Sequence, residues 1–558
     1  MIGRLQTSRR EIRVGVLVLI VAVWVFIPRT AQADDLQDQL AWGPHAVGFR
    51  SQIVLDHARR YETTFDEGQT YGAGGKSPRP ILINIWYPAK AADSGEPAAT
   101  RMEYGDYLRL QSDQPDVQRW ADALSTYAEG VIAQEFFATS VDELNADQLL
   151  AWHRFLASPT RCQRDAAPQA GPFPVVVYHS GAGSSFEDNS VFCEYLASCG
   201  YVIIGSAFQA ADGSSFGIDA RDGSVADMEF LARHAASLSF VDWRRMAFAG
   251  HSAGAQASLR ALTRTDCPAD VLVMLDTTVD YYSLAVPTFR YITDLAIEHI
   301  EQLRRPMLVC AGPEAAFQMC DRLVNSDRVY LTVPELGHNE FIAQGVLRLG
   351  VLKWMGEDAL SEELQKELKR AEKVERLYVQ TCQATQAWLD LQLQQQLDAF
   401  EQLAKDYSKT QLGEDQLAVE FVPVGVSQAD AYQEDSHVAP TPRQLYRLAS
   451  EVSIDRITRI LEQHREQSAE SPVYQSNMLM CSLLYDLLEQ DRLEDARRLN
   501  AYAQAIGVDG VSTLRFLAFM SKLGSHNERA RHFLERALLV DPNDEESKQL
   551  LKELEGGN

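Results

Sequence analysis

Short apolar runs alternate with stretches of helical periodicity between about residue 45 and residue 350. This alternation is typical of a mostly parallel sheet covered by helices, because strands that are buried on both faces give continuous apolar runs. The first two runs are expected to pair as antiparallel strands. The pattern predicts strands at Gln52–Leu55, Ile81–Tyr87, Pro174–His179, Tyr201–Ser206, Met246–Ala249, Val271–Leu275, Met307–Ala311 and Val329–Val333.

Two further stretches belong to the predicted sheet domain, which covers residues 44–405. Residues 102–165 interrupt the alternation with a helical, aromatic-rich insertion, which is either a lid over a site or a segment that packs its aromatic side chains into the core. Residues 351–406 are helical and are expected to pack on the sheet. Residues 408–440 carry Gly, Pro, Ser and acidic residues without a sustained period, which is typical of a linker.

Beyond the linker, residues 441–558 have a wholly helical pattern with an internal repeat. Two stretches align at an offset of 34 residues, so that Ala496 matches Ala530 and Ala503 matches Ala537. With Pro542 closing the later copy, this spacing resembles a tetratricopeptide repeat. The resemblance implies an all-α domain that either binds a protein partner or packs against the sheet domain.

The N-terminal segment has the pattern of an export signal. Basic residues between Arg4 and Arg13 precede the apolar stretch Val14–Ile27, and Ala31-Gln32-Ala33 follows. Residues 1–33 are therefore predicted to be a cleaved signal peptide, which makes the protein periplasmic or secreted and leaves no membrane span in the mature chain. The alternative is an uncleaved segment that anchors the protein in the inner membrane, although 14 apolar residues are fewer than the roughly 20 that span a bilayer.

The predicted mature chain is acidic. Without residues 1–33, which hold five Arg and one Glu, the counts of Lys plus Arg and of Asp plus Glu fall from 52 and 78 to 47 and 77. Phosphate binding needs clustered Lys and Arg, so nucleic acid and anionic membranes are not expected as partners. The eight cysteines include no CxxC pair, so no metal site is expected. In an oxidising compartment, Cys310 and Cys320 are a candidate disulfide pair.

The strongest chemical signal is Gly250-His251-Ser252-Ala253-Gly254, which directly follows the apolar run Met246–Ala249. A strand followed by G-x-S-x-G is typical of a nucleophile elbow, in which small residues permit a tight turn that exposes the serine hydroxyl. Ser252 is therefore the candidate nucleophile for acyl transfer.

A serine nucleophile needs an imidazole that takes its proton and a carboxylate that orients the imidazole. With this type of elbow the chain order is nucleophile, acid, histidine, and His338 follows the last predicted strand. Two carboxylates end suitable strands, Asp276 after Val271–Leu275 and Glu314 after Met307–Ala311. We favour Asp276, because its strand immediately follows the elbow unit, and we keep Glu314 as the alternative acid.

Negative charge that develops on a substrate carbonyl needs preorganised N–H donors. The Ala253 amide is one candidate, and the turn His179–Ser184 after the central strand is expected to supply the second through Ala182 or, alternatively, Gly181. A glycine-rich phosphate loop is the competing interpretation of this turn. No G-K-[ST] or G-x-G-x-x-G pattern follows it, so no nucleotide cofactor is expected.

These motifs resemble the platelet-activating-factor acetylhydrolase and dienelactone hydrolase branch of the α/β-hydrolases over residues 44–405. The similar features are the Gly-Ala-Gly turn, the Gly-His-Ser-Ala-Gly elbow, Asp276 and the terminal Gly-His. The resemblance implies a doubly wound, mostly parallel sheet and ester-cleaving activity, and it further favours Asp276 as the acid. Departures at Ala255-Gln256 and Ser180 leave the substrate range and the geometry of the oxyanion hole open.

The sequence therefore predicts an exported serine hydrolase that cleaves small-molecule carboxylic esters through Ser252, His338 and Asp276, without a cofactor. Two alternatives stay open. One is a serine peptidase or amidase with the same triad, and the other is a non-catalytic scaffold that acts through its helical repeats.

Overall fold

A computed structural model describes residues 36–64, 70–72, 74–75, 77–90, 101–209, 222–282, 285–356, 360–398, 417–427, 432–433, 439–466, 469, 471–523 and 526–556. The chain separates into two units, Met1–Ala41 and Trp42–Asn558. Of the first unit the structure describes residues 36–41, with helix α2 at Leu36–Gln39. The predicted signal peptide, residues 1–33, lies outside the described residues.

Most described strands of the second unit join one sheet in the order β13-β12-β11-β10-β9-β7-β8-β4-β1-β6-β5. Two short strands, β2 (Thr63–Thr64) and β3 (Thr70–Tyr71), pair separately. The large sheet consists of β1 (Ala46–Tyr61), β4 (Ser77–Ala89), β5 (Arg101–Glu103), β6 (Pro159–Arg164), β7 (Phe173–His179), β8 (Val202–Gly205), β9 (Val241–His251), β10 (Val271–Leu275), β11 (Met307–Ala311), β12 (Arg328–Thr332) and β13 (Ala418–Val422).

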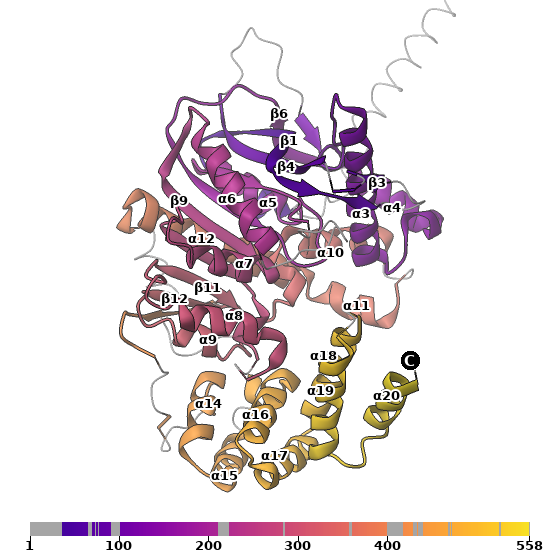
Figure 1. The fold of residues 1–558 in the computed structure, drawn as a ribbon, viewed down its shortest axis with the longest axis vertical. Coiled ribbons are helices and arrows are strands. Elements are labelled where there is room, and N and C mark those ends of the chain that lie inside the picture. The colour runs from indigo at the N-terminus through magenta and orange to yellow at the C-terminus, as the bar shows by residue number, and fades with distance from the viewer. Residues whose placement is uncertain are drawn as a thin grey trace, which may run out of the picture. The chain divides into compact units, whose positions relative to one another are not determined.

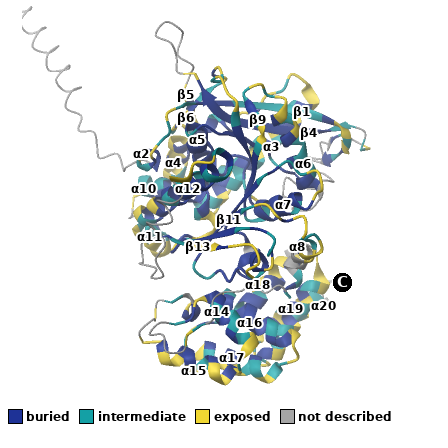
Figure 2. Ribbon diagram, turned by 90° about the vertical axis from the view of Figure 1, so that its left-hand side faces the viewer, coloured by how far each residue is buried: buried dark blue, intermediate teal, exposed yellow. Residues whose placement is uncertain are grey.

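The centre of the sheet is parallel. Strands β8, β7, β9, β10, β11 and β12 pair in parallel along that order, whereas β1 and β4 pair antiparallel (Figure 1). The eight runs predicted as strands fall on β1, β4 and β7 to β12, and the antiparallel pairing of the first two is confirmed. The central strands are almost fully buried, which explains why they are continuous apolar runs (Figure 2).

The sheet ends in a strand that the sequence pattern did not indicate. β13 pairs antiparallel with β12 and lies inside residues 408–440, the segment predicted as a linker. β13 is a five-residue edge strand with one buried residue and with Glu420 in its middle, so it lacks the uninterrupted apolar run of a central strand.

Helices follow the parallel strands in the chain, and those that contact the sheet directly include α5, α6, α7 and α12. Two hydrogen bonds attach the long helix α12. Its Asp390 accepts the hydroxyl of Tyr201, which directly precedes β8, and the hydroxyl of its Tyr378 donates to Asn189, which directly precedes α5. These helices are α5 (Ser190–Ser198), α6 (Asp222–Ala236), α7 (Ala253–Leu262), α8 (Pro287–Glu298), α9 (Gln318–Asp321), α10 (Ala343–Met355), α11 (Glu362–Lys369) and α12 (Ala371–Gln394).

The aromatic-rich insertion contains helices α3 (Pro115–Phe137) and α4 (Ala146–Leu156). Six of its aromatic side chains are buried, those of Tyr104, Tyr107, Trp120, Phe136, Trp152 and Phe155. Arg154 of α4 also stacks over the ring of Trp354 in α10, 4.3 Å from the centroid. In this structure the insertion is thus packed as part of the domain, and opening as a lid stays a proposal.

Residues 441–558 are helical in their described part. The helices are α14 (Pro442–Glu451), α15 (Ile454–His464), α16 (Asn477–Glu489), α17 (Leu493–Ala505), α18 (Gly510–Leu523), α19 (Asn527–Val540) and α20 (Glu545–Gly556). α17 and α19 begin 34 residues apart, at Leu493 and Asn527, and the four aligned alanines of the sequence repeat are all buried. The assignment of these helix pairs to tetratricopeptide repeats remains a proposal. No described helix is both long and apolar enough to cross a bilayer.

Candidate active site

The candidate nucleophile sits in a strained turn between β9 and α7. Ser252 has φ 53° and ψ −119°, a backbone conformation that L-residues rarely adopt. The flanking glycines are required sterically. A Cβ on Gly250 would lie 2.3 Å from the Gly254 carbonyl carbon, and a Cβ on Gly254 would lie 2.2 Å from the His179 carbonyl oxygen. The turn therefore has the backbone geometry expected for an elbow.

Asp276 ends the strand next to that of Ser252. The β9–β10 register pairs Leu275 with His251, so Asp276 and Ser252 follow at the same level of neighbouring strands. The Ser252 N–H donates to the Leu275 carbonyl over 3.0 Å, and the Asp276 N–H donates to the Cys310 carbonyl over 2.7 Å. These bonds continue the ladder past the strand ends and fix both residues at one edge of the sheet. Asp276 also has a positive φ, 45°.

His338 lies in the turn η5 (His338–Phe341), which follows β12. Its Nδ1 is 2.6 Å from Asp276 Oδ2. The side chain of His338 is 40% exposed whereas that of Asp276 is 5% exposed, so the imidazole has a buried acid on one side and solvent on the other. A carboxylate at Nδ1 leaves Nε2 as the nitrogen that can exchange protons with a substrate or nucleophile.

His251 links this turn to the elbow. Its Nε2 is 2.9 Å from the His338 carbonyl oxygen, and the two imidazole rings are 4.7 Å apart between centroids. Burial lowers the pKa of His251 well below its ordinary value, so the ring is neutral at pH 7 and donates its Nε2 proton to that carbonyl. Because Ser252 follows His251 directly, this bond holds the turn of His338 beside the elbow.

The candidate oxyanion donors lie in the loop after β7 and at the first residue of α7. The N–H of Gly181 donates to Asp188 Oδ2 over 3.4 Å, which commits that amide to the protein. Among the described residues, the N–H groups of Ala182 and Ala253 make no hydrogen bond within the chain. A Cβ on Gly181 would lie 2.7 Å from His251 Nδ1, so a glycine is needed where this loop approaches the elbow. These contacts favour Ala182 over Gly181 as the second donor.

The alternative acid, Glu314, lies elsewhere. Its Oε2 accepts a hydrogen bond from Ser476 Oγ over 2.5 Å, at the N-terminus of α16, and burial raises its pKa. Of the two carboxylates weighed from sequence, Asp276 is therefore the one in contact with His338.

Several residues that support the site were missed by the sequence analysis. The Tyr281 hydroxyl donates to Asp276 Oδ1, and Glu340 of the His338 turn accepts bonds from Arg370 Nη1 and Nη2 over 2.8 and 2.9 Å. Asn339 Nδ2 lies 2.9 Å from Oε1 and Oε2 of Glu135 in the insertion. No sequence pattern marks such contacts, because each joins side chains through the folded path of the chain.

Two buried acids follow Ala182 in the loop between β7 and α5. Glu187 and Asp188 are fully buried, and burial raises the pKa of each to about 7. Asp188 Oδ1 accepts the Tyr178 hydroxyl over 3.1 Å, and the Asp188 carbonyl accepts the Gln344 N–H over 2.8 Å. The loop is therefore tied to the start of α10, which follows the turn of His338.

In the described part of the chain, no group of three or more His, Cys, Asp or Glu side chains is arranged so that it could hold a metal ion. All eight cysteines are unpaired, including the candidate pair Cys310 and Cys320. Their side chains face different partners: Cys310 bonds Thr385, whereas Cys320 bonds Asp280. The candidate pair Cys310 and Cys320 is thus not joined in this structure.

No family model and no curated protein sequence matches the chain. One solved structure that aligns with this chain is a ferulic acid esterase from Streptomyces cinnamoneus. It is 16% identical in sequence, and the alignment covers 67% of this chain and 96% of the esterase chain with a TM-score of 0.40.

Proposed function

We propose that this protein is a serine hydrolase that cleaves carboxylic esters through Ser252, His338 and Asp276, on a sheet of the α/β-hydrolase type. The observation that carries the proposal is the 2.6 Å contact between His338 Nδ1 and Asp276 Oδ2, at the end of the strand beside the elbow of Ser252. The proposal includes export, which rests on the sequence pattern of residues 1–33 alone.

In the proposed reaction, Ser252 Oγ attacks the ester carbonyl carbon while His338 Nε2 takes the hydroxyl proton. Asp276 keeps the imidazole in the required tautomer and stabilises the imidazolium. The N–H groups of Ala253 and Ala182 bind the oxyanion. His338 then gives its proton to the leaving alcohol, and a water activated by the same imidazole hydrolyses the acyl-enzyme.

A fluorophosphonate probe, which forms a covalent bond only with an activated serine, tests this proposal. The wild-type protein is expected to be labelled and Ser252→Ala to be unlabelled. Ser258→Ala is a matched control, because this buried serine of α7 donates to the Gly254 carbonyl within the helix and is expected to leave labelling unchanged. Wild-type protein that resists the probe would favour the scaffold interpretation.

A matched ester and amide of the same acyl group then separates an esterase from a peptidase or amidase. We expect hydrolysis of the ester by the wild type and a loss of at least about 10³-fold in Ser252→Ala. Faster hydrolysis of the amide than of the ester would contradict the proposed ester specificity while leaving the triad in place.

A further inference from the structure

The carboxylate of Asp276 is held from two sides. Oδ2 faces His338, whereas Oδ1 accepts the hydroxyl of Tyr281 and, over 3.3 Å, the N–H of Gly312. The Gly312 N–H also lies 2.5 Å from the Tyr281 hydroxyl oxygen. Because Oδ1 has two donors of its own besides the contact of Oδ2 with His338, Tyr281 and Gly312 help to fix the orientation of the carboxylate.

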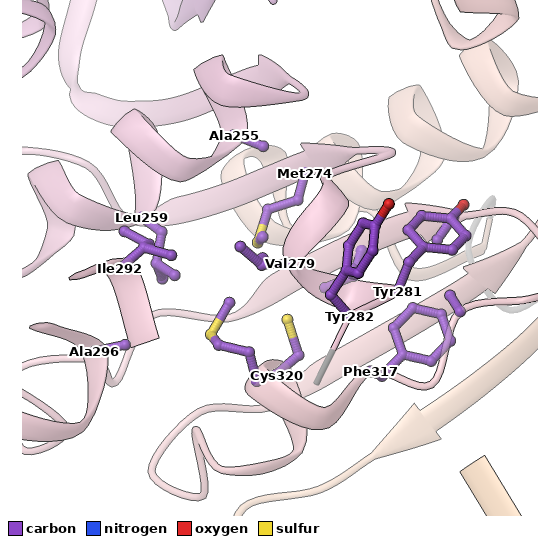
Figure 3. Packing of buried hydrophobic residues seen from close by; sticks show 14 of the residues in the cluster. Ala255, Leu259, Met274, Val279, Tyr281, Tyr282, Ile292, Ala296, Phe317 and Cys320 are labelled. Carbon is purple, nitrogen blue, oxygen red and sulfur yellow. The ribbon is translucent and has the colours of Figure 1, made fainter. Parts of the chain in front are cut away.

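Tyr281 itself has little freedom to move. It is 7% exposed and belongs to the buried apolar cluster that also contains Val279, Tyr282 and Phe317 (Figure 3). A Cβ on Gly312 would lie 3.0 Å from the Tyr281 hydroxyl oxygen, so a glycine leaves just enough room for the phenol. Burial raises the pKa of Tyr281 well above its ordinary value, which keeps the hydroxyl protonated and able to donate at neutral pH.

Helix α16 of the helical region and its N-cap residue bond the two loops that follow β10 and β11. Ser482 Oγ donates to the carbonyl oxygen of Tyr281 over 3.2 Å in a buried contact. Ser476, which caps the same helix by accepting the Leu479 N–H, donates to Glu314 on the loop after β11. One helix therefore contacts the loop after β10 and the loop after β11.

We propose that Tyr281 is a positioning residue for Asp276 and that α16 holds Tyr281 in place. The helical region thereby helps to orient the acid of a triad whose three residues all lie in the sheet domain. This inference rests on the proposed function, because it gives Asp276 and His338 their roles in the triad. Helix α16 then supports the position of the triad acid through Tyr281, while the other helices of the region have no such role in this inference.

The expected sign of the effect follows from the charges around Asp276. The titratable groups that face it are those of His338, Tyr281, Asp280, Glu314 and Cys310. Burial raises the pKa of Asp280 to about 7 and also raises the pKa of Glu314, so both are less charged than ordinary carboxylates. Loss of the Tyr281 hydroxyl leaves the Asp276 charge less stabilised, so the imidazolium of His338 pairs with it more strongly and the pKa of His338 rises.

The test compares Tyr281→Phe and Ser482→Ala with two control variants in the full-length protein. Tyr474→Phe removes a buried hydroxyl that donates to the Leu461 carbonyl, and Ser521→Ala removes one that donates to the Leu517 carbonyl, so that each variant loses a bond within the helical region. We measure kcat and KM for an ester across pH, and the pKa of His338 by NMR, with His338→Gln to assign the resonance.

Tyr281→Phe is expected to lower kcat about tenfold with KM within about twofold, and to raise the pKa of His338 and the acidic limb of kcat/KM by about half a unit or more. Ser482→Ala is expected to lower kcat about threefold, again with KM nearly unchanged and with a raised pKa of His338. Both controls are expected to match the wild type in kcat and in the pKa of His338. Wild-type kcat and an unchanged His338 pKa in Tyr281→Phe would overturn the inference.

The NMR measurement needs no turnover, so it separates this inference from the proposed function. A raised His338 pKa in Tyr281→Phe together with unlabelled wild-type protein would support the positioning role and reject the hydrolase. A labelled wild type with an unchanged His338 pKa in Tyr281→Phe would support the hydrolase and reject the positioning role of Tyr281.

Discussion

His338 Nδ1 lies 2.6 Å from Oδ2 of Asp276, 62 positions earlier in the chain. The Asp276 carboxylate is buried, whereas the His338 imidazole is partly open to solvent. A buried acid next to an accessible imidazole is the arrangement that general-base activation of a serine requires.

Replacing this acid is the most direct test of its role. Asp276→Asn is expected to lower kcat/KM by about 10³- to 10⁴-fold, because a neutral amide neither stabilises the imidazolium nor enforces the tautomer. Glu314→Gln, the matched change at the other carboxylate, is expected to keep kcat/KM within about threefold of the wild type. Equal losses in steady-state ester hydrolysis by the two variants would reject Asp276 as the acid.

The elbow is expected to tolerate no side chain at Gly254. Gly254→Ala forces Cβ against the backbone carbonyl oxygens of His179 and Ser180, at 2.2 and 2.5 Å, so the turn must shift. We expect a loss of about 3 kcal/mol or more in the free energy of unfolding, together with loss of probe labelling. Gly350→Ala in α10, where a Cβ meets nothing within 4 Å, is expected to raise stability by about 0.5–1 kcal/mol. Thermal melts of both variants test this contrast.

The attachment of α14 depends on a buried ion pair. Arg443 contacts Asp321 through Nη2 and Nε, at 2.6 and 2.8 Å, while Tyr330 donates to the same carboxylate over 2.8 Å. Arg443→Met leaves the carboxylate buried without its cation, and we expect a loss of about 3–5 kcal/mol.

The control for this pair is Arg447→Met on the same helix. Arg447 pairs with Glu451 at 2.8 Å, but both side chains are considerably more exposed. Its loss is expected to cost at most about 0.5 kcal/mol. Urea denaturation followed by circular dichroism measures both variants, and equal midpoints would contradict the structural role of Arg443.

The stability of the protein should fall with rising pH because of Glu187. Burial raises the pKa of this carboxyl from 4.5 to about 7, so the folded state binds more protons than the unfolded state between these values. The free energy of unfolding therefore decreases as pH rises from about 4.5 to about 7 and levels off above that, a loss on the order of 3 kcal/mol from this group.

Glu187→Gln removes this contribution, so its melting temperature is expected to fall less between pH 5 and pH 8 than that of the wild type. Some decline remains, because Asp188 has a similarly raised pKa. Glu535→Gln, the same change at an exposed position of α19, is expected to show the wild-type slope. A slope in Glu187→Gln equal to that of the wild type would contradict the prediction.

The sequence by itself determined the local features of this protein. The strands Val271–Leu275 and Met307–Ala311 coincide with β10 and β11, because burial on both faces demands continuous apolar runs. The tight turn around Ser252 was readable because it needs small residues within two positions of the serine. Such features depend on backbone geometry among near neighbours in the chain.

Only the tertiary structure decided which distant groups meet. From sequence, Asp276 and Glu314 were both suitable acids, and the position of α16 and the path of the chain after β12 bring one to His338 and the other to Ser476. The contact of Tyr281 with Asp276 and that of Ser482 with Tyr281 have no sequence signature. The physical reason is that hydrogen bonds between side chains depend on distances set by the packing of whole helices and strands, which no local pattern of polar and apolar residues records.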